Sequence, residues 1–231
     1  MTPSSVSRET PPRLIAVLGT GTEVGKTHVS VALAAALASR GEAVCALKPI
    51  ESGVTSGTLT DAARLAEVST VPPGRAPYRF EPPVSPHLAA RRAGVGISVE
   101  VAAAWVRGHR AGVLLVETAG AVLSPLGPGL TNLDLARALV PEAVVLVGVD
   151  RLGVLHEVSA CLLVLRTLAP ELPVPVVVLN EPGTADASTG TNAEELEGLG
   201  VATGVVVLGR GEATSRGSLE RAREVLVRGG F

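Results

Sequence analysis

Aromatic side chains and an excess of positive charge are both missing from this sequence of 231 residues. Phe, Trp and Tyr make up 2% of the chain, and the formal net charge is −2 at pH 7. Proteins that bind nucleic acids stack bases on aromatic side chains and attract the phosphate backbone with basic surfaces. We therefore expect no nucleic-acid partner.

Cysteines and long apolar runs are also scarce. Cys45 and Cys161 both lie in apolar stretches, so we interpret them as small buried hydrophobes rather than a disulfide, as in a cytoplasmic protein. Apolar runs such as 143–149 are too short to span a membrane, so we expect no membrane partner. Residues 1–12 are polar, contain three prolines and lack the apolar core of a signal peptide, which predicts a short disordered tail.

Strand-like and helix-like segments alternate along the rest of the chain. The expected strands cover residues 14–18, 43–47, 113–116, 143–149, 174–179 and 205–208. The expected helices cover residues 25–39, 61–68, 98–109, 132–139, 155–168, 192–199 and 218–227. This alternation is typical of a doubly wound α/β fold, a mostly parallel sheet with helices on both faces. With the glycine-rich loop described below, we expect the P-loop NTPase type of this fold. Since no repeat or long linker interrupts the alternation, we expect a single domain over residues 13–231.

Two local features refine this prediction. Residues 71–86 contain six prolines, so we expect this segment to be mostly irregular. Ser98 and Asn132 stand at the starts of two expected helices, where their side chains would cap the first turn.

A glycine-rich loop follows the first expected strand and opens the first expected helix. Backbone N–H groups in such a loop bind phosphate oxygens, and the helix N-terminus adds positive potential. Lys26 would then contact the β- and γ-phosphates of a nucleoside triphosphate, and Thr27 would offer its hydroxyl to Mg²⁺. The usual pattern G-x-x-x-x-G-K-[ST] has glycine where this chain has Thr20. The loop reads Gly19-Thr20-Gly21-Thr22-Glu23-Val24-Gly25-Lys26-Thr27.

Three charged residues follow expected strands or open an expected helix. Glu117 and Lys48 end two strands, so both point to the carboxyl edge of the sheet, where parallel sheets bind ligands. Glu117 and Asp61 are candidate Mg²⁺ carboxylates, and Lys48 would place positive charge near a phosphoryl group in transfer. Ordinary solvated strand ends would also explain Glu117 and Lys48, and helix capping would explain Asp61.

Asn180 ends the expected strand 174–179, where its amide could contact the edge of a nucleotide base. Turn formation explains an asparagine at this position equally well. A GTPase would need an Asn-Lys-x-Asp segment here, whereas this chain has Asn180-Glu181-Pro182. Adenine, or loose base selectivity, is therefore favoured.

Taken together, these segments resemble the dethiobiotin synthetase family. The loop is similar to that family's variant, including the threonine at position 20, and Asn180 falls where the family has an asparagine near the adenine. The resemblance extends over residues 13–210. Its other matching segments are Lys48-Pro49-Ile50-Glu51-Ser52-Gly53, Asp61-Ala62, Ser85-Pro86-His87 and Val116-Glu117-Thr118-Ala119-Gly120.

The resemblance implies an enzyme of biotin biosynthesis that uses ATP and Mg²⁺. Its substrates would be 7,8-diaminopelargonate and CO₂ or bicarbonate, and ring closure would run through a carbamate and a carbamic–phosphoric anhydride. Such chemistry needs alignment and charge neutralisation more than a protein nucleophile. The family forms homodimers, so the resemblance also implies a homodimer in which the turn at 152–155 would reach the substrate of the neighbouring subunit.

The resemblance also assigns roles to individual residues. The expected catalytic residues are Lys26, Lys48 and Thr22. The expected nucleotide-binding residues are Gly21, Thr22, Glu23, Val24, Gly25, Lys26, Thr27 and Asn180. The expected substrate-binding residues are Ser52, Glu117, Ala121, Leu152, Gly153 and Val154, and the expected metal ligands are Thr27, Asp61 and Glu117.

Several residues depart from the family pattern. Gly21 stands where many members have an aspartate, and Thr118 and Ala121 replace glycines beside the substrate. His156 and Glu157 stand where the family has an Asn-His pair. These changes affect the fit of the substrate rather than the binding of ATP, so nucleotide binding is the firmer expectation. They leave open the alternative of a P-loop ATPase that has drifted to another substrate.

Two other classes of protein compete with this interpretation. A partition or division-site ATPase with a regulatory role would carry a second lysine near the start of the loop, where this chain has Gly21. A cobyrinate-type amidotransferase synthetase would need a further glutaminase domain, for which the chain is too short.

Overall fold

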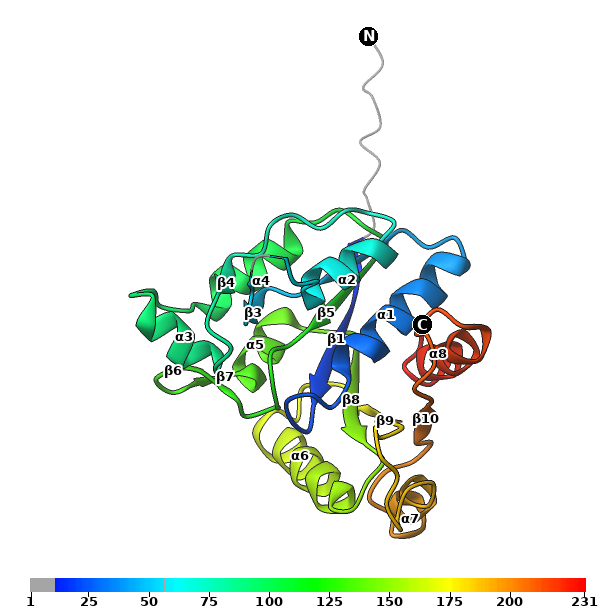
Figure 1. The fold of residues 1–231 in the computed structure, drawn as a ribbon. Coiled ribbons are helices and arrows are strands. Elements are labelled where there is room, and N and C mark those ends of the chain that lie inside the picture. The colour runs from blue at the N-terminus through cyan, green and yellow to red at the C-terminus, as the bar shows by residue number, and fades with distance from the viewer. Residues whose placement is uncertain (1–10, 56) are drawn as a thin grey trace.

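The computed structural model describes residues 11–55 and 57–231, so the tail expected at 1–12 lies almost wholly outside the described residues. In the described part of the chain, six strands form one parallel sheet in the order β10-β9-β8-β1-β5-β2 (Figure 1). Their bounds are β1 (Arg13–Gly19), β2 (Val44–Leu47), β5 (Val113–Glu117), β8 (Ala143–Val149), β9 (Val176–Asn180) and β10 (Val206–Leu208). The expected doubly wound α/β fold is confirmed.

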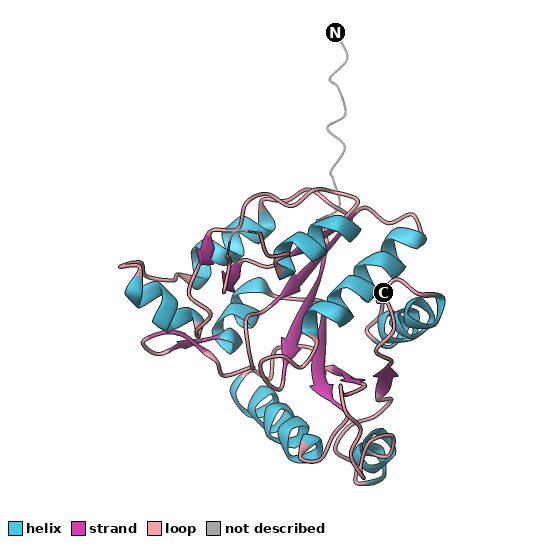
Figure 2. Ribbon diagram, in the orientation of Figure 1, coloured by secondary structure: helices cyan, strands magenta, loops and turns pink. Residues whose placement is uncertain are grey.

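Helices cover both faces of this sheet (Figure 2). One face packs against α1 (Lys26–Ser39), α2 (Asp61–Val68) and α8 (Arg216–Arg228). The other packs against α4 (Val99–Arg107), α5 (Asn132–Leu139), α6 (Val154–Leu168) and α7 (Asn192–Gly198). Because side chains alternate along a strand, Ile15 and Val17 of β1 face the first layer, and Leu14 and Ala16 face the second.

Short elements at the carboxyl edge extend this framework. A parallel pair joins β3 (Ile50–Ser52) to β4 (Tyr78–Phe80), and an antiparallel pair joins β6 (Pro125–Gly127) to β7 (Leu130–Thr131). The helix α3 (Pro86–Arg92) lies beside them. None of these five elements was predicted. Residues 71–86 are mostly irregular as expected, apart from β4, where the prolines flank Tyr78–Phe80 and the two aromatic rings are buried.

Asn132 has a different role from the cap that we predicted. The N-cap of α5 is Thr131, whose backbone N–H donates to Asp134 Oδ2 at 2.8 Å. The buried Asn132 amide donates to the carbonyls of Ala119 and Ala121, at 2.6 and 2.8 Å. The side chain therefore ties the loop after β5 to α5, where a buried amide needs partners. Ser98 caps α4 as expected, with its hydroxyl accepting from Val101 N–H at 3.1 Å.

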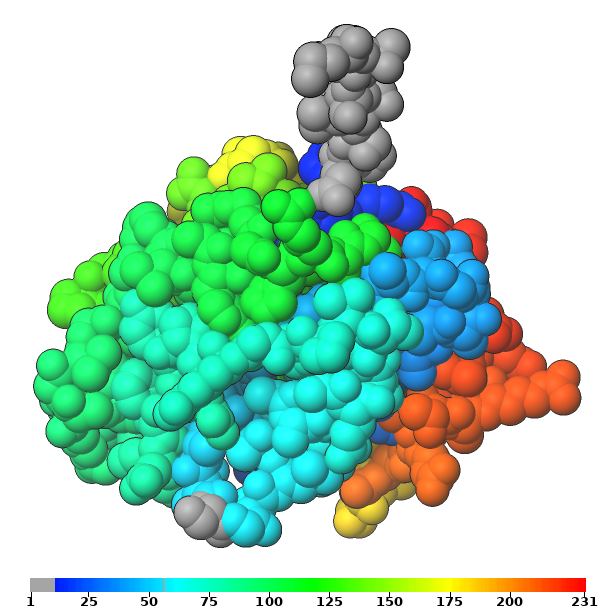
Figure 3. Space-filling view, turned by 90° about the horizontal axis from the view of Figure 1, so that it is seen from above, coloured from blue at the N-terminus to red at the C-terminus, as the bar shows by residue number. Residues whose placement is uncertain are grey.

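The first helix, α1, packs between two other helices on the same face of the sheet. Seen from above, α1 lies between α2, in cyan, and α8, in red (Figure 3). The carboxyl ends of β1, β2 and β5 therefore lead into the same region at the start of α1 and α2. No helix of the described residues is long and apolar enough to cross a membrane.

Candidate functional site

A cavity of about 1200 Å³ opens at the carboxyl edge of the sheet. The glycine-rich loop and the start of α1 form its floor, and α2, β3 and the segment 83–86 form its walls. Residues 211–214, before α8, close another side. Its position matches the place where open α/β sheets bind ligands.

The loop between β1 and α1 needs glycine at position 25. Gly25 has φ +85°, and a Cβ there would lie 2.4 Å from the Asn180 amide nitrogen. Glu23 also adopts a positive φ, of 59°, which is uncommon for a residue other than glycine. Thr20, at the variant position, donates its hydroxyl to Glu157 Oε2 at 3.1 Å. Asn180 at the end of β9 and Glu157 in α6 therefore both contact the loop and help to hold its conformation.

Lys26 folds back over this loop. Its ammonium donates to the Gly21 carbonyl at 2.9 Å, and the residue is 6% exposed. Burial lowers its pKa to about 8, partly offset by the negative charge of Glu117, while the positive charge of Lys48 lowers it further. A bound polyanion would favour the charged form of this lysine.

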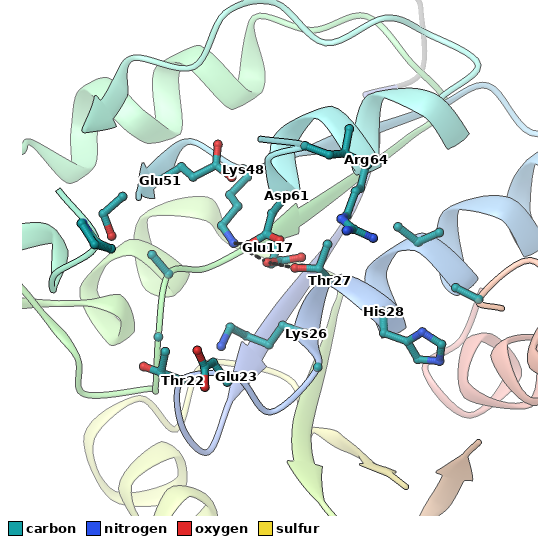
Figure 4. Close-up of a pocket in the computed structure, with 18 of the residues that line it drawn as sticks. Thr22, Glu23, Lys26, Thr27, His28, Lys48, Glu51, Asp61, Arg64 and Glu117 are labelled. Atoms are coloured by element: carbon teal, nitrogen blue, oxygen red, sulfur yellow. Dashed lines mark hydrogen bonds and ion pairs between the residues drawn. The ribbon is translucent and has the colours of Figure 1, made fainter. Parts of the chain in front are cut away.

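Lys48 connects the two acidic residues predicted at the site. Its Nζ lies 2.7 Å from Glu117 Oε1 and 2.5 Å from Asp61 Oδ2, and Thr27 Oγ1 donates to Glu117 Oε1 at 2.9 Å (Figure 4). Burial by itself lowers the pKa of Lys48, but the charges of Glu117 and Asp61 outweigh it and raise that pKa. Burial raises the pKa of Asp61, but the charge and hydrogen bond of Lys48 outweigh it and lower that pKa. Sequence segments far apart therefore meet in one charged cluster.

The cluster fits a bound Mg²⁺ ion. Glu117 Oε2 is buried and has no hydrogen-bond partner among the described residues, so this oxygen is available as a ligand. Asp61 contributes a second carboxylate and Thr27 a hydroxyl within the same cluster. Oxygen donors of this kind, with one or two carboxylates beside substrate phosphates, are typical of Mg²⁺ sites.

A smaller hollow of about 280 Å³ lies beyond the loop. Asn180 lines it, and its amide nitrogen donates to the carbonyls of Val24 and Gly25 at 2.8 and 3.1 Å. Asn180 Oδ1 remains buried, with no partner in the described part of the chain. His28 lines both this hollow and the larger cavity, so the two spaces adjoin.

The remaining predicted residues divide between the cavity and its surroundings. Ser52, Thr22 and Glu23 line the cavity. Ala121 and the turn at 152–154 do not belong to its lining, and Leu152 is 75% exposed.

Two of the departures from the family pattern have local structural explanations. Thr118 is buried and donates its hydroxyl to the Val17 carbonyl at 3.1 Å, so it faces the sheet rather than the cavity. Glu157 accepts from Arg151 at 2.8 Å as well as from Thr20.

Glu51 was missed as a site residue, although it lies within a segment that carries the resemblance. It lines the cavity and is 4% exposed, and its Oε1 accepts from Ala62 N–H at 3.2 Å. Burial raises its pKa. A glutamate close behind a strand-end lysine was the only signal for it, and such a residue is usually solvated.

Comparisons with known proteins identify the fold and the family. A family model described as an AAA domain matches residues 13–214. Two solved structures share the fold at low sequence identity: a ParA family ATPase from Chlorobium tepidum TLS (16% identity, TM-score 0.53, 94% of this chain and 91% of that chain) and the MinC:MinD cell division protein complex of Aquifex aeolicus (12% identity, TM-score 0.56, 94% and 95%). They show the fold alone.

Curated relatives are much more similar in sequence. The chain is 41% identical to the ATP-dependent dethiobiotin synthetase BioD of Caulobacter sp. (strain K31), over 71% of this chain and 74% of the relative. It is 37% identical to the protein of the same name from Parafrankia sp. (strain EAN1pec), over 90% and 92%, and 38% identical to that of Rhodococcus jostii (strain RHA1), over 85% and 84%. At these identities and coverages, the chain belongs to the ATP-dependent dethiobiotin synthetase family.

Proposed function

We propose that this chain is a dethiobiotin synthetase, which uses ATP and Mg²⁺ to close 7,8-diaminopelargonate and CO₂ into dethiobiotin. The observation that carries the proposal is the cluster of Lys48, Asp61, Glu117 and Thr27 beside the phosphate loop. It faces a cavity of about 1200 Å³, large enough for a nucleotide and a second substrate together. Membership of the family supports the same reaction.

The reaction balances without a protein nucleophile. One amine adds to CO₂ and loses a proton, which gives a carbamate. A carbamate oxygen attacks the γ-phosphorus of ATP, the bond to the β-phosphate oxygen breaks, and ADP leaves. The second amine then attacks the carbamoyl carbon, and the C–O bond breaks with its electron pair leaving on phosphate. The ureido ring closes as the second amine loses a proton.

The residues of the cavity would align these groups and compensate their charge. Lys26 and Lys48 would lie beside the transferred phosphoryl group, where positive charge stabilises the transition state most. Thr22 and Ser52 would contact the carbamate, because their hydroxyls line the cavity near the loop and β3 respectively. Bound by Thr27, Asp61 and Glu117, Mg²⁺ would neutralise phosphate charge.

The base would occupy the smaller hollow beside Asn180. Because the Asn180 nitrogen is engaged by two backbone carbonyls, its oxygen remains as the acceptor on this side. An acceptor pairs with the exocyclic amino group of adenine but is repelled by the corresponding carbonyl oxygen of guanine. This arrangement supports ATP rather than GTP as the nucleotide.

We also propose that the protein is a cytoplasmic homodimer and that residues 13–231 form one domain. Leu152 is exposed and its turn is absent from the lining of its own cavity, which supports contact with a neighbouring subunit. Both cysteines are free thiols, which agrees with a reducing compartment.

The direct test incubates the purified protein with Mg-ATP and bicarbonate, with and without 7,8-diaminopelargonate. Phosphate release that depends on the diamine, with dethiobiotin detected by mass, would support the proposal. The Lys26→Ala variant should lose both signals, while an Arg166→Gln variant on α6 should retain them. ATP turnover that ignores the diamine would instead indicate a partition-type or drifted ATPase.

A further inference from the structure

Arg64 extends from α2 into the cavity, although nothing in the sequence motifs marks it. It stands three residues after Asp61, so both side chains lie on one face of the helix. Arg64 belongs to the cavity lining, and its guanidinium points toward the side of the cavity that Thr27 and His28 line (Figure 4). A cation from α2 therefore faces the start of α1 across the cavity.

The Arg64 guanidinium has no hydrogen bond or salt bridge with any described residue, although Glu67 lies three residues further along the same helix. Its charge does reach Asp61, where it contributes to lowering the pKa of that carboxyl. By contrast, the arginines of α8 are engaged: Arg216, Arg221 and Arg228 all pair with glutamates of their own helix. Five donors of Arg64 thus remain available to a ligand in the cavity.

The cations of the cavity lining differ in whether they are already paired with carboxylates. Lys26, Lys48 and Arg64 are the lysine and arginine side chains among the described residues of its lining. Lys48 is already shared by Asp61 and Glu117, and Lys26 lies on the loop itself. On the opposite wall, Arg64 is thus the cation not committed to a carboxylate.

We propose that Arg64 binds the α- and β-phosphates of the nucleotide from the α2 side, opposite the glycine-rich loop. The proposal rests on the proposed use of ATP. Lys26 and His28 set the direction of the phosphates along the cavity. The γ-phosphate would lie at Lys26, and the α-phosphate would lie near His28, which also lines the hollow proposed for the base. A planar guanidinium between these ends would bind phosphate oxygens in pairs. Since the α- and β-phosphates are common to ATP and ADP, Arg64 would hold both.

The test measures the binding of Mg-ATP, Mg-ADP and AMP to the full chain by titration calorimetry. In Arg64→Gln the Kd for ATP and the Kd for ADP should each rise roughly tenfold, the loss expected for one charge-assisted contact. Arg64→Lys should recover part of this loss, because lysine keeps the charge but not the planar fork. Arg166→Gln, an exposed arginine on α6 outside the cavity, should bind like the unmodified chain.

The outcomes separate this proposal from the proposed function. Arg64→Gln that binds ATP and ADP as tightly as Arg166→Gln would overturn it, and loss of ATP binding alone would overturn the placement at the α- and β-phosphates. If the unmodified chain binds neither nucleotide, the proposed use of ATP fails instead. Equal urea midpoints for the nucleotide-free proteins establish that Arg64→Gln folds, so that weaker binding reports the lost contact.

Discussion

The ammonium of Lys48 lies 2.7 Å from Glu117 Oε1, and the side chains of both residues are almost fully buried. A buried ion pair is not strongly stabilising as a whole, but loss of one partner leaves the other charge buried and unpaired. The relationship therefore predicts how the molecule responds when either charge is removed.

Lys48→Met should lower the free energy of unfolding by about 3 to 5 kcal/mol, because the buried Glu117 carboxylate would lose its ion-pair partner. Urea denaturation measures this. The matched control is Arg137→Met, which removes an exposed ion pair with Glu171 and should cost at most about 1 kcal/mol. Lys48→Met combined with Glu117→Gln should regain part of the stability but no activity. If Lys48→Met and Arg137→Met lower the free energy of unfolding by the same amount, the account of the buried pair is contradicted.

Gly25→Ala should abolish ATP binding while the protein still folds. The residue has a positive φ, and the added Cβ would lie 2.4 Å from the Asn180 amide nitrogen, so either the loop or the Asn180 side chain that holds it must shift. Calorimetry with Mg-ATP and circular dichroism measure the two effects. Gly41→Ala has a similar φ of 81° but open space around it, which makes it a control for backbone strain alone. ATP binding that survives in Gly25→Ala would show that the loop does not need this geometry.

Asn180→Ala should weaken ATP binding and reduce the preference for ATP over GTP. The substitution removes the acceptor in the base hollow and leaves the carbonyls of Val24 and Gly25 without their donor, a cost of about 1 to 3 kcal/mol. Competition between the two nucleotides measures the preference. An unchanged ratio of the two affinities would place the base elsewhere.

Lys26 should make both stability and ATP affinity depend on pH. Its pKa is about 8 in the nucleotide-free protein against an ordinary value of 10.5, so between these values the folded chain binds fewer protons than the unfolded chain. The free energy of unfolding should therefore rise with pH across this window, and Lys26→Met should lose that rise.

The same pKa shift predicts proton uptake when ATP binds. The polyanion favours the charged ammonium, so above about pH 8 ATP affinity should fall with increasing pH, by up to about tenfold per pH unit. Calorimetry at pH 9 in two buffers of different ionisation enthalpy measures the uptake directly. An affinity that is the same at pH 7 and pH 9 would contradict this role of Lys26.

The sequence predicted the sheet and the loop well because these depend on local patterns. Buried parallel strands are apolar and end at the ligand edge, so Glu117 and Lys48 could be placed there from their positions alone. The meeting of Glu117 and Asp61 at the Lys48 ammonium could not be predicted, since it depends on how α2 packs against the sheet. The direction of the Thr118 side chain could not be predicted either, because it depends on a tertiary contact: its hydroxyl donates to the carbonyl of Val17 in the neighbouring strand β1.

The proposed ring closure is tested most directly with ¹³C-bicarbonate, Mg-ATP and 7,8-diaminopelargonate, by measuring the mass of the product and the phosphate released. The account predicts dethiobiotin that carries one labelled carbon in its ureido ring, formed in equal amount to phosphate. Phosphate released without labelled dethiobiotin, or at the same rate without the diamine, would contradict it.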